Sequence, residues 1–326
     1  MICSGEIAQG KLRHALSFDV EEHFQVAAFW SAARRREWDQ LASRVERNTR
    51  KVTELLSEHS TKATFFILGW VAVRHPDLVK DLAQQGHEIA SHGYGHELVH
   101  TQTLTEFRED VRRSKQILED LIGRQVMGYR APSFSITPRT EWAISVLIEE
   151  GYRYDSSIYN RFRGTQESAD ARTGAYQLET EAGTIWEVSP STVNACGLQL
   201  PVAGGGYFRL FPYAVSKKLL KNLEKQGAQL VMYLHPWEFD PEQPRMDGPL
   251  LSQVRHYLNL GKTEQRLRWL LRDFYFAPIN DVIRPIRDIF EGLGVCSRAI
   301  VQREGRRSCP LSIVKTNDHH EVVEEI

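Results

Sequence analysis

The order of apolar and amphipathic segments predicts an α/β protein built on a mostly parallel sheet. Short apolar runs that suit strands alternate with amphipathic stretches of roughly 10–15 residues that suit helices. No GxGxxG motif follows the first apolar run and no Walker loop is present, so neither nucleotide-binding arrangement is indicated. Because strand–helix–strand crossovers are right-handed, the remaining choices are a barrel or a doubly wound sheet.

The predicted strands are short, and Ala63–Leu68 among them is apolar and rich in residues that favour strands. They are Ala15–Val20, Ala63–Leu68, Glu88–Ser91, Val126–Arg130, Arg153–Ser156, Thr184–Val188 and Gln229–Leu234. The segment Arg161–Gly183 is polar and is predicted to be a loop. Each strand candidate is bounded by polar residues, glycine or a helical pattern, which is the spacing that βαβ units require.

The predicted helices combine apolar spacing with recognisable end signals. They are Arg44–His59, Pro76–Gln85, Thr103–Ile122, Thr137–Gly151 and Tyr213–Gln226. Proline in the first turn of the second helix and Gly86 just beyond it are a start and a stop signal. Thr103 with Glu106 forms a capping-box pattern, and Gly123 ends that helix.

Length and composition describe a globular chain without an electrostatic preference for nucleic acid. The 326 residues include 41 Lys and Arg against 42 Asp and Glu, for a net charge of −1. Nucleic-acid binders usually carry a basic excess, so we expect no such partner. The four cysteines are scattered without a C-x-x-C pair, which argues against a disulfide framework and fits a reducing compartment.

No segment of the sequence suits membrane crossing or export. The longest apolar run, Ala63–Val73, is far shorter than the ~20 residues that a membrane helix needs. No apolar stretch of signal-peptide length precedes the first predicted strand. We therefore expect a cytoplasmic protein with no transmembrane segment, and a membrane-peripheral position is compatible with this.

Polar residues follow several predicted strands at the point where each strand ends. Asp19, His92, Arg130, Asp155 and His235 all lie at or just beyond a carboxyl end. Polar residues occur there simply because the chain is leaving the core, which is the plainer reading of any one of them. In (β/α) barrels, however, the same rim is where catalytic groups converge, and five in succession predict a site.

The segment from His92 to His96 and the end of the first strand predict a metal site. Two glycines lie between the histidines, so a strand-to-loop turn would aim both imidazoles at one point; a glycine-rich surface loop is the alternative. Asp19 and Glu21 alternate onto one face of the strand, so one carboxylate can bind metal while the other accepts a proton from water. The alternative is an acidic strand end that caps the next helix. Two imidazoles and a carboxylate suit Zn²⁺ or Fe²⁺.

The five segments SFDVEEHF, SHGYGH, RAPSF, YDSS and LHPWE, in this order, resemble the motifs of the NodB-homology polysaccharide deacetylases, carbohydrate esterase family 4. They are most similar to the branch found with exopolysaccharide and exosortase loci. The resemblance spans roughly residues 12–276 and implies an α/β fold, a distorted (β/α)₇ barrel. It divides the chain into a deacetylase barrel, residues 1–276, and a C-terminal helical extension with a weakly ordered tail, residues 277–326.

The resemblance also implies roles for the residues at the strand ends. Asp19 would be the general base, and Arg130 beside it would orient that carboxylate and keep it ionised. His235 would be the general acid that protonates the departing amine, and Asp155 would orient and charge this histidine. His92 would be a metal ligand.

His96 would be the second imidazole ligand of the metal. Most of the family has two adjacent aspartates in the first motif, the second binding metal, whereas position 20 is valine. Strand alternation predicts Glu21 as the carboxylate ligand, with Glu22 as the alternative if the strand ends early. Zn²⁺ is the expected ion, with Co²⁺, Ni²⁺, Fe²⁺ and Mn²⁺ as alternatives.

Three aromatic residues are candidates for sugar binding. Trp237 could stack on a sugar ring or pack against the core, and Tyr207 follows glycines that form either a wall of a glycan cleft or a plain turn. Tyr94 is a weaker candidate. The remaining histidines, including His87, His100 and His256, are expected at the surface.

The resulting functional prediction is a metal-dependent hydrolase that removes N-acetyl groups from amino sugars of an N-acetylated glycan and releases acetate. Association with polysaccharide assembly machinery fits the resemblance. Two alternatives remain: a ureide or amide hydrolase of the same fold without strict metal dependence, and a catalytically silent glycan-binding scaffold protein. Retention of the base, the acid, the arginine and both histidines argues against the silent scaffold.

Overall fold

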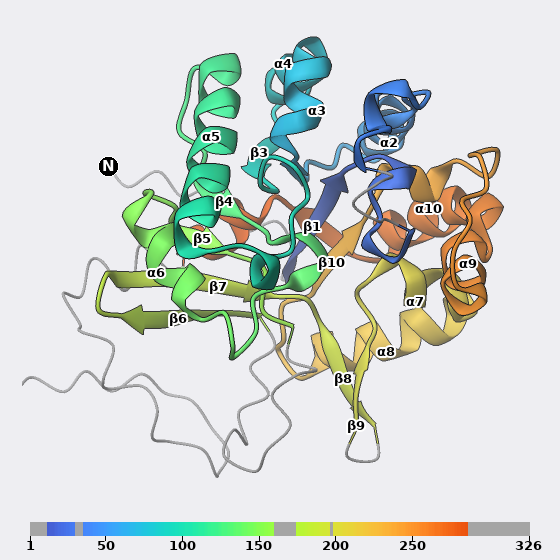
Figure 1. Cartoon of the computed structure of the whole chain (residues 1–326). Helices are drawn as coiled ribbons and strands as arrows, with labels where there is room; N and C mark the ends of the chain where they lie inside the picture. The colour runs from blue at the N-terminus through green and yellow to red at the C-terminus, as the bar shows by residue number, and fades with distance from the viewer. Residues whose placement is uncertain (1–11, 30–34, 160–173, 196–197, 286–326) are drawn as a thin grey trace, which may run out of the picture.

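The main sheet of the computed structural model runs through the middle of the molecule, with helices beside it (Figure 1). The structure describes residues 12–29, 35–159, 174–195 and 198–285. In these residues the main sheet has nine strands. They are β1 (Arg13–Val20), β2 (Thr64–Ile67), β3 (Glu88–Ser91), β4 (Gly128–Tyr129), β5 (Tyr154–Asp155), β6 (Gly174–Thr180), β7 (Gly183–Ser189), β10 (Val231–Leu234) and β11 (Tyr275–Ala277).

The strand order is that of a curled, open barrel. Neighbours run β10-β1-β2-β3-β4-β5-β7-β6, with β11 pairing to β1, and every pairing is parallel except that of β6 with β7. Within the described residues no ladder joins the two end strands, β10 and β6. The expected distorted barrel is confirmed, in the form of a curled sheet that leaves one side unclosed.

The register of β1 decides which side chains meet at the carboxyl edge of the sheet. Phe18 of β1 is paired with Leu234 of β10, and Val20 is paired with Ile67 of β2. Ile67 is in turn paired with Ser91 of β3. The residues that follow these positions therefore emerge at one level, on one rim.

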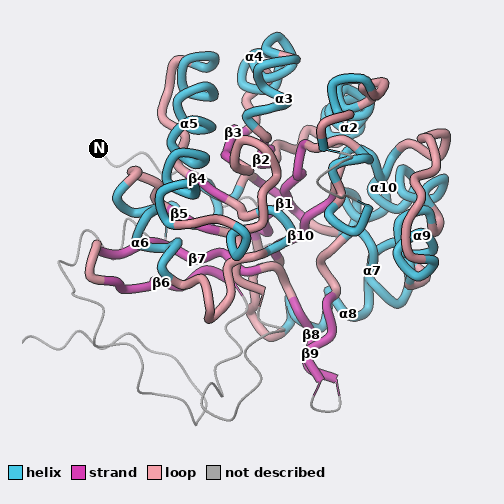
Figure 2. The backbone as a smooth tube through the Cα atoms, in the orientation of Figure 1, coloured by secondary structure: helices cyan, strands magenta, loops and turns pink. Residues whose placement is uncertain are grey.

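Helices cover the outer side of the sheet and follow the strands in sequence, as Figure 2 shows. They are α2 (Val45–Glu58), α3 (Gly69–Arg74), α4 (Pro76–Gln84), α5 (Leu104–Ile122), α6 (Trp142–Glu149), α7 (Gly205–Leu210), α8 (Tyr213–Lys225), α9 (Leu250–Tyr257) and α10 (Thr263–Asp273). The predicted capping box is present at α5, where Thr103 and Glu106 satisfy each other's backbone N–H groups. Gly123 ends α5 with φ of 65°. Buried residues such as Leu56 and Phe65 fill one continuous core between helices and sheet.

Two local predictions need correction, and one hairpin was not predicted. Helix α6 begins at Trp142 and not near Thr137, because the Thr140 hydroxyl bonds to the backbone of Ser135 and Thr137 and holds a turn there. Of the predicted loop Arg161–Gly183, residues 161–173 lie outside the described residues, and residues 174–180 form β6, which pairs antiparallel with β7. A second hairpin, β8 (Thr192–Ala195) with β9 (Leu198–Pro201), projects below the sheet in Figure 1.

The carboxyl-terminal part of the described chain packs on the sheet. β11 pairs with β1 at Arg13–Ala15, and Ile279 and Ile283 just beyond it are buried. The expected division at residues 276 and 277 falls inside β11, and most of the predicted extension, residues 286–326, lies outside the described residues. Among the described helices, none combines the length and the apolar character needed to cross a bilayer.

Candidate active site

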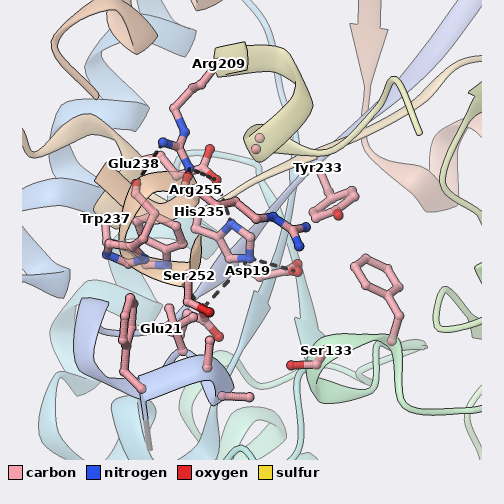
Figure 3. A pocket seen from close by; sticks show the side chains of 18 of the residues that line it. Asp19, Glu21, Ser133, Arg209, Tyr233, His235, Trp237, Glu238, Ser252 and Arg255 are labelled. Carbon is pink, nitrogen blue, oxygen red and sulfur yellow. Dashed lines mark hydrogen bonds and ion pairs between the residues drawn. The ribbon is translucent and has the colours of Figure 1, made fainter. Parts of the chain in front are cut away.

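A cavity of about 380 Å³ opens at the carboxyl edge of the sheet. Its walls contain Asp19, Glu21, His92, His96 and His235, five of the residues that the sequence singled out. Figure 3 shows Asp19 and His235 facing each other across it. Each of these residues lies at the end of a strand or in the loop directly after it, where the catalytic residues of (β/α) barrels are found.

Glu21, His92 and His96 converge at the base of this cavity. One ligand atom from each lies within 4.8 Å of the others, and all three residues are buried. Glu21 Oε2 lies 2.7 Å from His96 Nε2 and 3.7 Å from His92 Nε2. On its far side, His92 Nδ1 is 2.7 Å from the carbonyl oxygen of Arg130 and donates to it, which leaves Nε2 facing the carboxylate.

The charge state of Glu21 suits a cation ligand. Burial alone would raise its pKa, but the charge of His96 and hydrogen bonds from His92 and His96 outweigh it and hold the pKa well below its usual value. A carboxylate and two imidazole nitrogens are the ligand set that borderline divalent ions prefer. The residues present therefore fit a metal such as Zn²⁺.

Glu22 is turned away from the cavity and occupied elsewhere. Its carboxylate accepts hydrogen bonds from the backbone N–H groups of Arg44, at 3.0 Å and 3.1 Å, and Val45, at 3.2 Å, and from the Ser43 hydroxyl. An anion at this position satisfies unpaired donors at the start of α2. Of the two glutamates, only Glu21 lines the cavity, on the same side as Asp19.

Asp19 is held by a fully buried arginine. Arg130 Nη1 donates to Asp19 Oδ1 at 2.6 Å and to the Ser17 hydroxyl at 2.8 Å. Nη2 and Nε bind Ser156, at its hydroxyl (2.8 Å) and its carbonyl oxygen (3.1 Å). With Oδ1 fixed in this way, Asp19 Oδ2 points across the cavity, 3.8 Å from His235 Nε2.

His235 is paired with Glu238 and faces the cavity with its other nitrogen. Its backbone is extended, with φ −123° and ψ 145°, as Pro236 predicts. His235 Nδ1 lies 3.1 Å from Glu238 Oε1. Burial would lower the pKa of His235, but the hydrogen bond to Glu238 and the charges of Glu21, Glu238 and Asp19 raise the pKa to about 9. The imidazolium is therefore the stable form at neutral pH.

The expected partnership of Asp155 with His235 is wrong. Asp155 ends β5, and four strands separate β5 from β10 in the sheet. The Asp155 carboxylate instead accepts from the Ser157 hydroxyl and faces Glu187 of β7. Glu238, three residues after His235, occupies the place beside its Nδ1 instead.

The aromatic candidates behave differently from one another. Trp237 lines the cavity, but its ring is only 5% exposed and stacks on His235 and His256, with centroid distances of 5.0 Å and 4.1 Å. Its Nε1 donates to Glu21 Oε1 at 3.1 Å, so it supports the site as a packed residue. Tyr207 lines the cavity from α7. Tyr94 is not among the residues that line it.

Tyr94 packs elsewhere, with the Arg113 guanidinium 3.5 Å from its ring centroid. Two histidines expected at the surface are buried. His87 packs against Phe65 at 4.9 Å, and desolvation by burial lowers its pKa to about 4. His256 lies beneath Trp237, where burial and the charge of Arg209 lower its pKa to about 3. His100 is exposed as expected.

Glu238 lines the cavity and contacts His235, but the sequence analysis did not single it out, although it lies in the LHPWE segment. The signal was Pro236, which begins a 3₁₀ turn (Pro236–Phe239) and brings positions 235 and 238 together. The glycines before Tyr207 make room for it, because a Cβ on Gly205 would lie 2.0 Å or less from both Glu238 carboxylate oxygens. Arg209 lies 3.7 Å from Glu238 Oε1 on the opposite side.

Comparison with known proteins agrees with this geometry. Residues 37–154 match the family model described as polysaccharide deacetylase, and residues 156–284 match a domain of unknown function, DUF3473. A crystal structure of a candidate polysaccharide deacetylase from Mycobacterium smegmatis aligns with a TM-score of 0.59 at 20% identity, over 92% of this chain and 97% of that one. At that identity the likeness establishes the fold.

Curated relatives match over about a third of this chain. A peptidoglycan-N-acetylglucosamine deacetylase from Bacillus cereus is 34% identical over 96 residues, which are 29% of this chain and 35% of that protein. A peptidoglycan deacetylase from Helicobacter pylori is 27% identical over 108 residues, 33% of this chain and 36% of that protein. The chain thus spans about a third of the length of these two relatives. Over residues 37–154, the chain is thus similar to the polysaccharide deacetylase family.

Proposed function

We propose that this protein is a metal-dependent N-deacetylase of amino-sugar glycans, releasing acetate and a free amine. The observation that carries the proposal is the meeting, in one cavity, of three units: the Glu21–His92–His96 cluster, the Asp19–Arg130 pair and the His235–Glu238 pair. The two relatives named as peptidoglycan deacetylases support an N-acetylated sugar as substrate.

Glu21, His92 and His96 would hold the ion through one carboxylate oxygen and two Nε2 atoms. When bound, a divalent ion such as Zn²⁺ lowers the pKa of a water molecule and polarises an acetyl carbonyl. The Nδ1 contact of His92 with a backbone carbonyl and the Trp237 bond to Glu21 fix the ligands in orientation.

The remaining residues carry the proton transfers of the proposed reaction. Asp19 Oδ2, free of the arginine, accepts the proton of the attacking water while Arg130 holds the other oxygen. His235, protonated and 3.8 Å from Asp19, delivers a proton from Nε2 to the departing nitrogen as the C–N bond breaks. Glu238 keeps that histidine oriented through Nδ1. Acid and base thus work from opposite sides of the cavity.

The test combines metal analysis with acetate release. The purified protein is expected to contain or take up one equivalent of divalent metal, and to release acetate from N-acetylated oligosaccharides until a chelator is added. Glu21→Gln should lose both metal and activity. Glu22→Gln, the matched control, should retain both while melting at a lower temperature, because it weakens the contacts at the start of α2.

Two results would count against the proposal. Acetate release that survives complete metal removal would favour a metal-independent amide hydrolase of the same fold. Unchanged metal binding in Glu21→Gln, with circular dichroism showing that the variant is folded, would contradict the assignment of Glu21, His92 and His96 as the metal ligands.

The finer assignments made from the sequence stay part of this proposal. They are the exopolysaccharide branch, the association with polysaccharide assembly machinery and the cytoplasmic location. The division of the chain at residue 276 is likewise a proposal; a shortened chain ending at residue 276 that folds and binds metal would support it, and one that fails to fold while a chain ending at residue 285 folds would contradict it.

A further inference from the structure

Among the described residues, one arginine on the wall of the candidate active site has no acidic partner. Arg255 belongs to α9 and lines the same cavity as Asp19 and His235. Its side chain passes over Gly206, where a Cβ would lie 3.4 Å from Nε, and its guanidinium lies 5.9 Å from the Tyr207 ring centroid. Figure 3 shows this side chain extending into the cavity between His235 and Tyr233.

The other charges of the cavity are already compensated within the protein. Asp19 is paired with Arg130, Glu21 with His96, and Glu238 with His235. Arg209 faces Glu238 and donates to the backbone carbonyls of residues 256 and 258, at 2.8 Å and 2.7 Å.

Arg255 differs from these groups. Throughout the described ranges, no carboxylate lies within 4.0 Å of its guanidinium nitrogens. The cation instead faces the space that a substrate would fill. A guanidinium presents a planar fork of donors that matches a carboxylate or a phosphate, so an anionic group entering this space would meet a complementary partner.

Two hydroxyl groups lie on the same wall. Ser252 precedes Arg255 by three residues on α9, which places both on one helix face, and both line the cavity. Tyr207 of α7 lines it as well, beneath the guanidinium. The wall therefore offers a charge and additional donors in one place.

We propose that Arg255, with Ser252 and Tyr207, binds an anionic group carried by the sugar that is deacetylated. This inference rests on the proposed deacetylase function and narrows its substrate to an acidic N-acetylated sugar. The cavity, about 380 Å³, lies near the lower end of the ~300–1,000 Å³ that small-molecule sites occupy. The anionic group must therefore sit on the reacting sugar or be attached directly to it.

Both a phosphorylated sugar and a sugar that carries a carboxylate would present an anionic group to Arg255, and the test distinguishes the two. The three probes are neutral di-N-acetylchitobiose, its 1-phosphate, and the disaccharide of N-acetylglucosamine and N-acetylmuramic acid, whose lactyl group carries a carboxylate. For the metal-loaded wild-type protein, kcat/KM should be higher for at least one anionic probe than for the neutral one. Which anionic probe is preferred identifies the source of the negative charge.

Substitution of Arg255 then tests the residue. Arg255→Gln should lower the ratio of kcat/KM for the preferred anionic probe over the neutral probe by about 10- to 100-fold, mainly through KM, since one charged hydrogen-bonded contact is lost. Arg255→Lys should restore part of the ratio because it returns the charge without the fork. Arg245→Gln removes a cation on an exposed residue outside the cavity and should leave the ratio unchanged.

The outcomes separate this inference from the proposed function. Turnover of the neutral probe with an equal or smaller rate for both anionic probes, or an unchanged ratio in Arg255→Gln, overturns the anion site while leaving the deacetylase intact. If no probe releases acetate, the proposed function fails. Calorimetric binding of the phosphorylated and carboxylated disaccharides to wild type and Arg255→Gln then decides the inference: tighter binding to wild type supports it, and equal binding overturns it.

Discussion

Two pairs of buried acids lie in the same sheet and have opposite surroundings. Asp19 and Glu21, at the end of β1, face an arginine, two histidines and the protonated His235. Asp155 of β5 and Glu187 of β7 are equally buried, but within the described chain neither forms an ion pair. Their described hydrogen-bonding neighbours are hydroxyls, backbone N–H groups and each other.

The difference shows how neighbours decide what a buried carboxylate does. At Glu21, burial is outweighed by histidine charge and hydrogen bonds, and the pKa falls well below its usual value. At Glu187, burial dominates and the charge of Asp155 adds to it, so the pKa rises well above its usual value; burial also raises the pKa of Asp155 to about 6. The surroundings of Glu21 thus favour an ionised carboxylate that can bind a cation, whereas those of Glu187 favour the protonated form.

The largest expected effect is the difference in activity between the variants Asp19→Asn and Asp155→Asn. Asp19→Asn removes the proposed base and should lower kcat by about 10²- to 10⁴-fold without loss of bound metal. Asp155→Asn should keep activity within about threefold, since its amide can still accept from Ser157 and donate to Glu187. Acetate-release kinetics and metal content of both variants provide the measurement. An equal loss of activity in Asp19→Asn and Asp155→Asn would contradict the proposed difference between the two pairs of acids.

A smaller effect on activity is expected from substitution of Glu238, the carboxylate that pairs with His235. The pKa of His235 is raised to about 9, so activity that needs the imidazolium should fall as the pH rises through that value. Glu238→Gln removes the partner charge, and the alkaline limb of the pH–rate profile should move from about 9 toward the usual 6.5. The rate at pH 8 falls accordingly.

Asp155→Asn is the control for this prediction, since the resemblance assigned to Asp155 the role that Glu238 holds. Its alkaline limb should coincide with that of the wild type. A shift in Asp155→Asn, with none in Glu238→Gln, would restore the original assignment.

The elements of the amino-terminal half could be predicted because local signals agree there with the tertiary structure. The strand alternation that placed Asp19 and Glu21 on one face holds in the structure, and so does the capping box at Thr103. Gly93, with φ of 75°, allows the turn that brings His92 and His96 together. In each case the information lies within a few consecutive residues.

The carboxyl-terminal half was harder because its site residues depend on non-local geometry. The sequence does not reveal that Asp155 faces Glu187 of β7, while His235 pairs with Glu238. His256 and Arg255 reach the cavity only because α9 returns to it after a long loop. No local pattern marks a helix as bordering a site that other segments build.

The smallest effect concerns the proton held between Asp155 and Glu187. Because the native pKa of Glu187 is raised, the folded protein binds a proton that the unfolded chain releases, so stability should decrease as the pH rises above about 4.5, the ordinary value of glutamate. One proton corresponds to at most about 1.4 kcal/mol per pH unit. Glu187→Gln cannot ionise and still donates to Asp155, so its urea unfolding free energy should change less between pH 5 and pH 8. Glu179→Gln, on the exposed side of the neighbouring β6, should keep the wild-type slope; equal slopes in all three proteins would mean that no proton is shared.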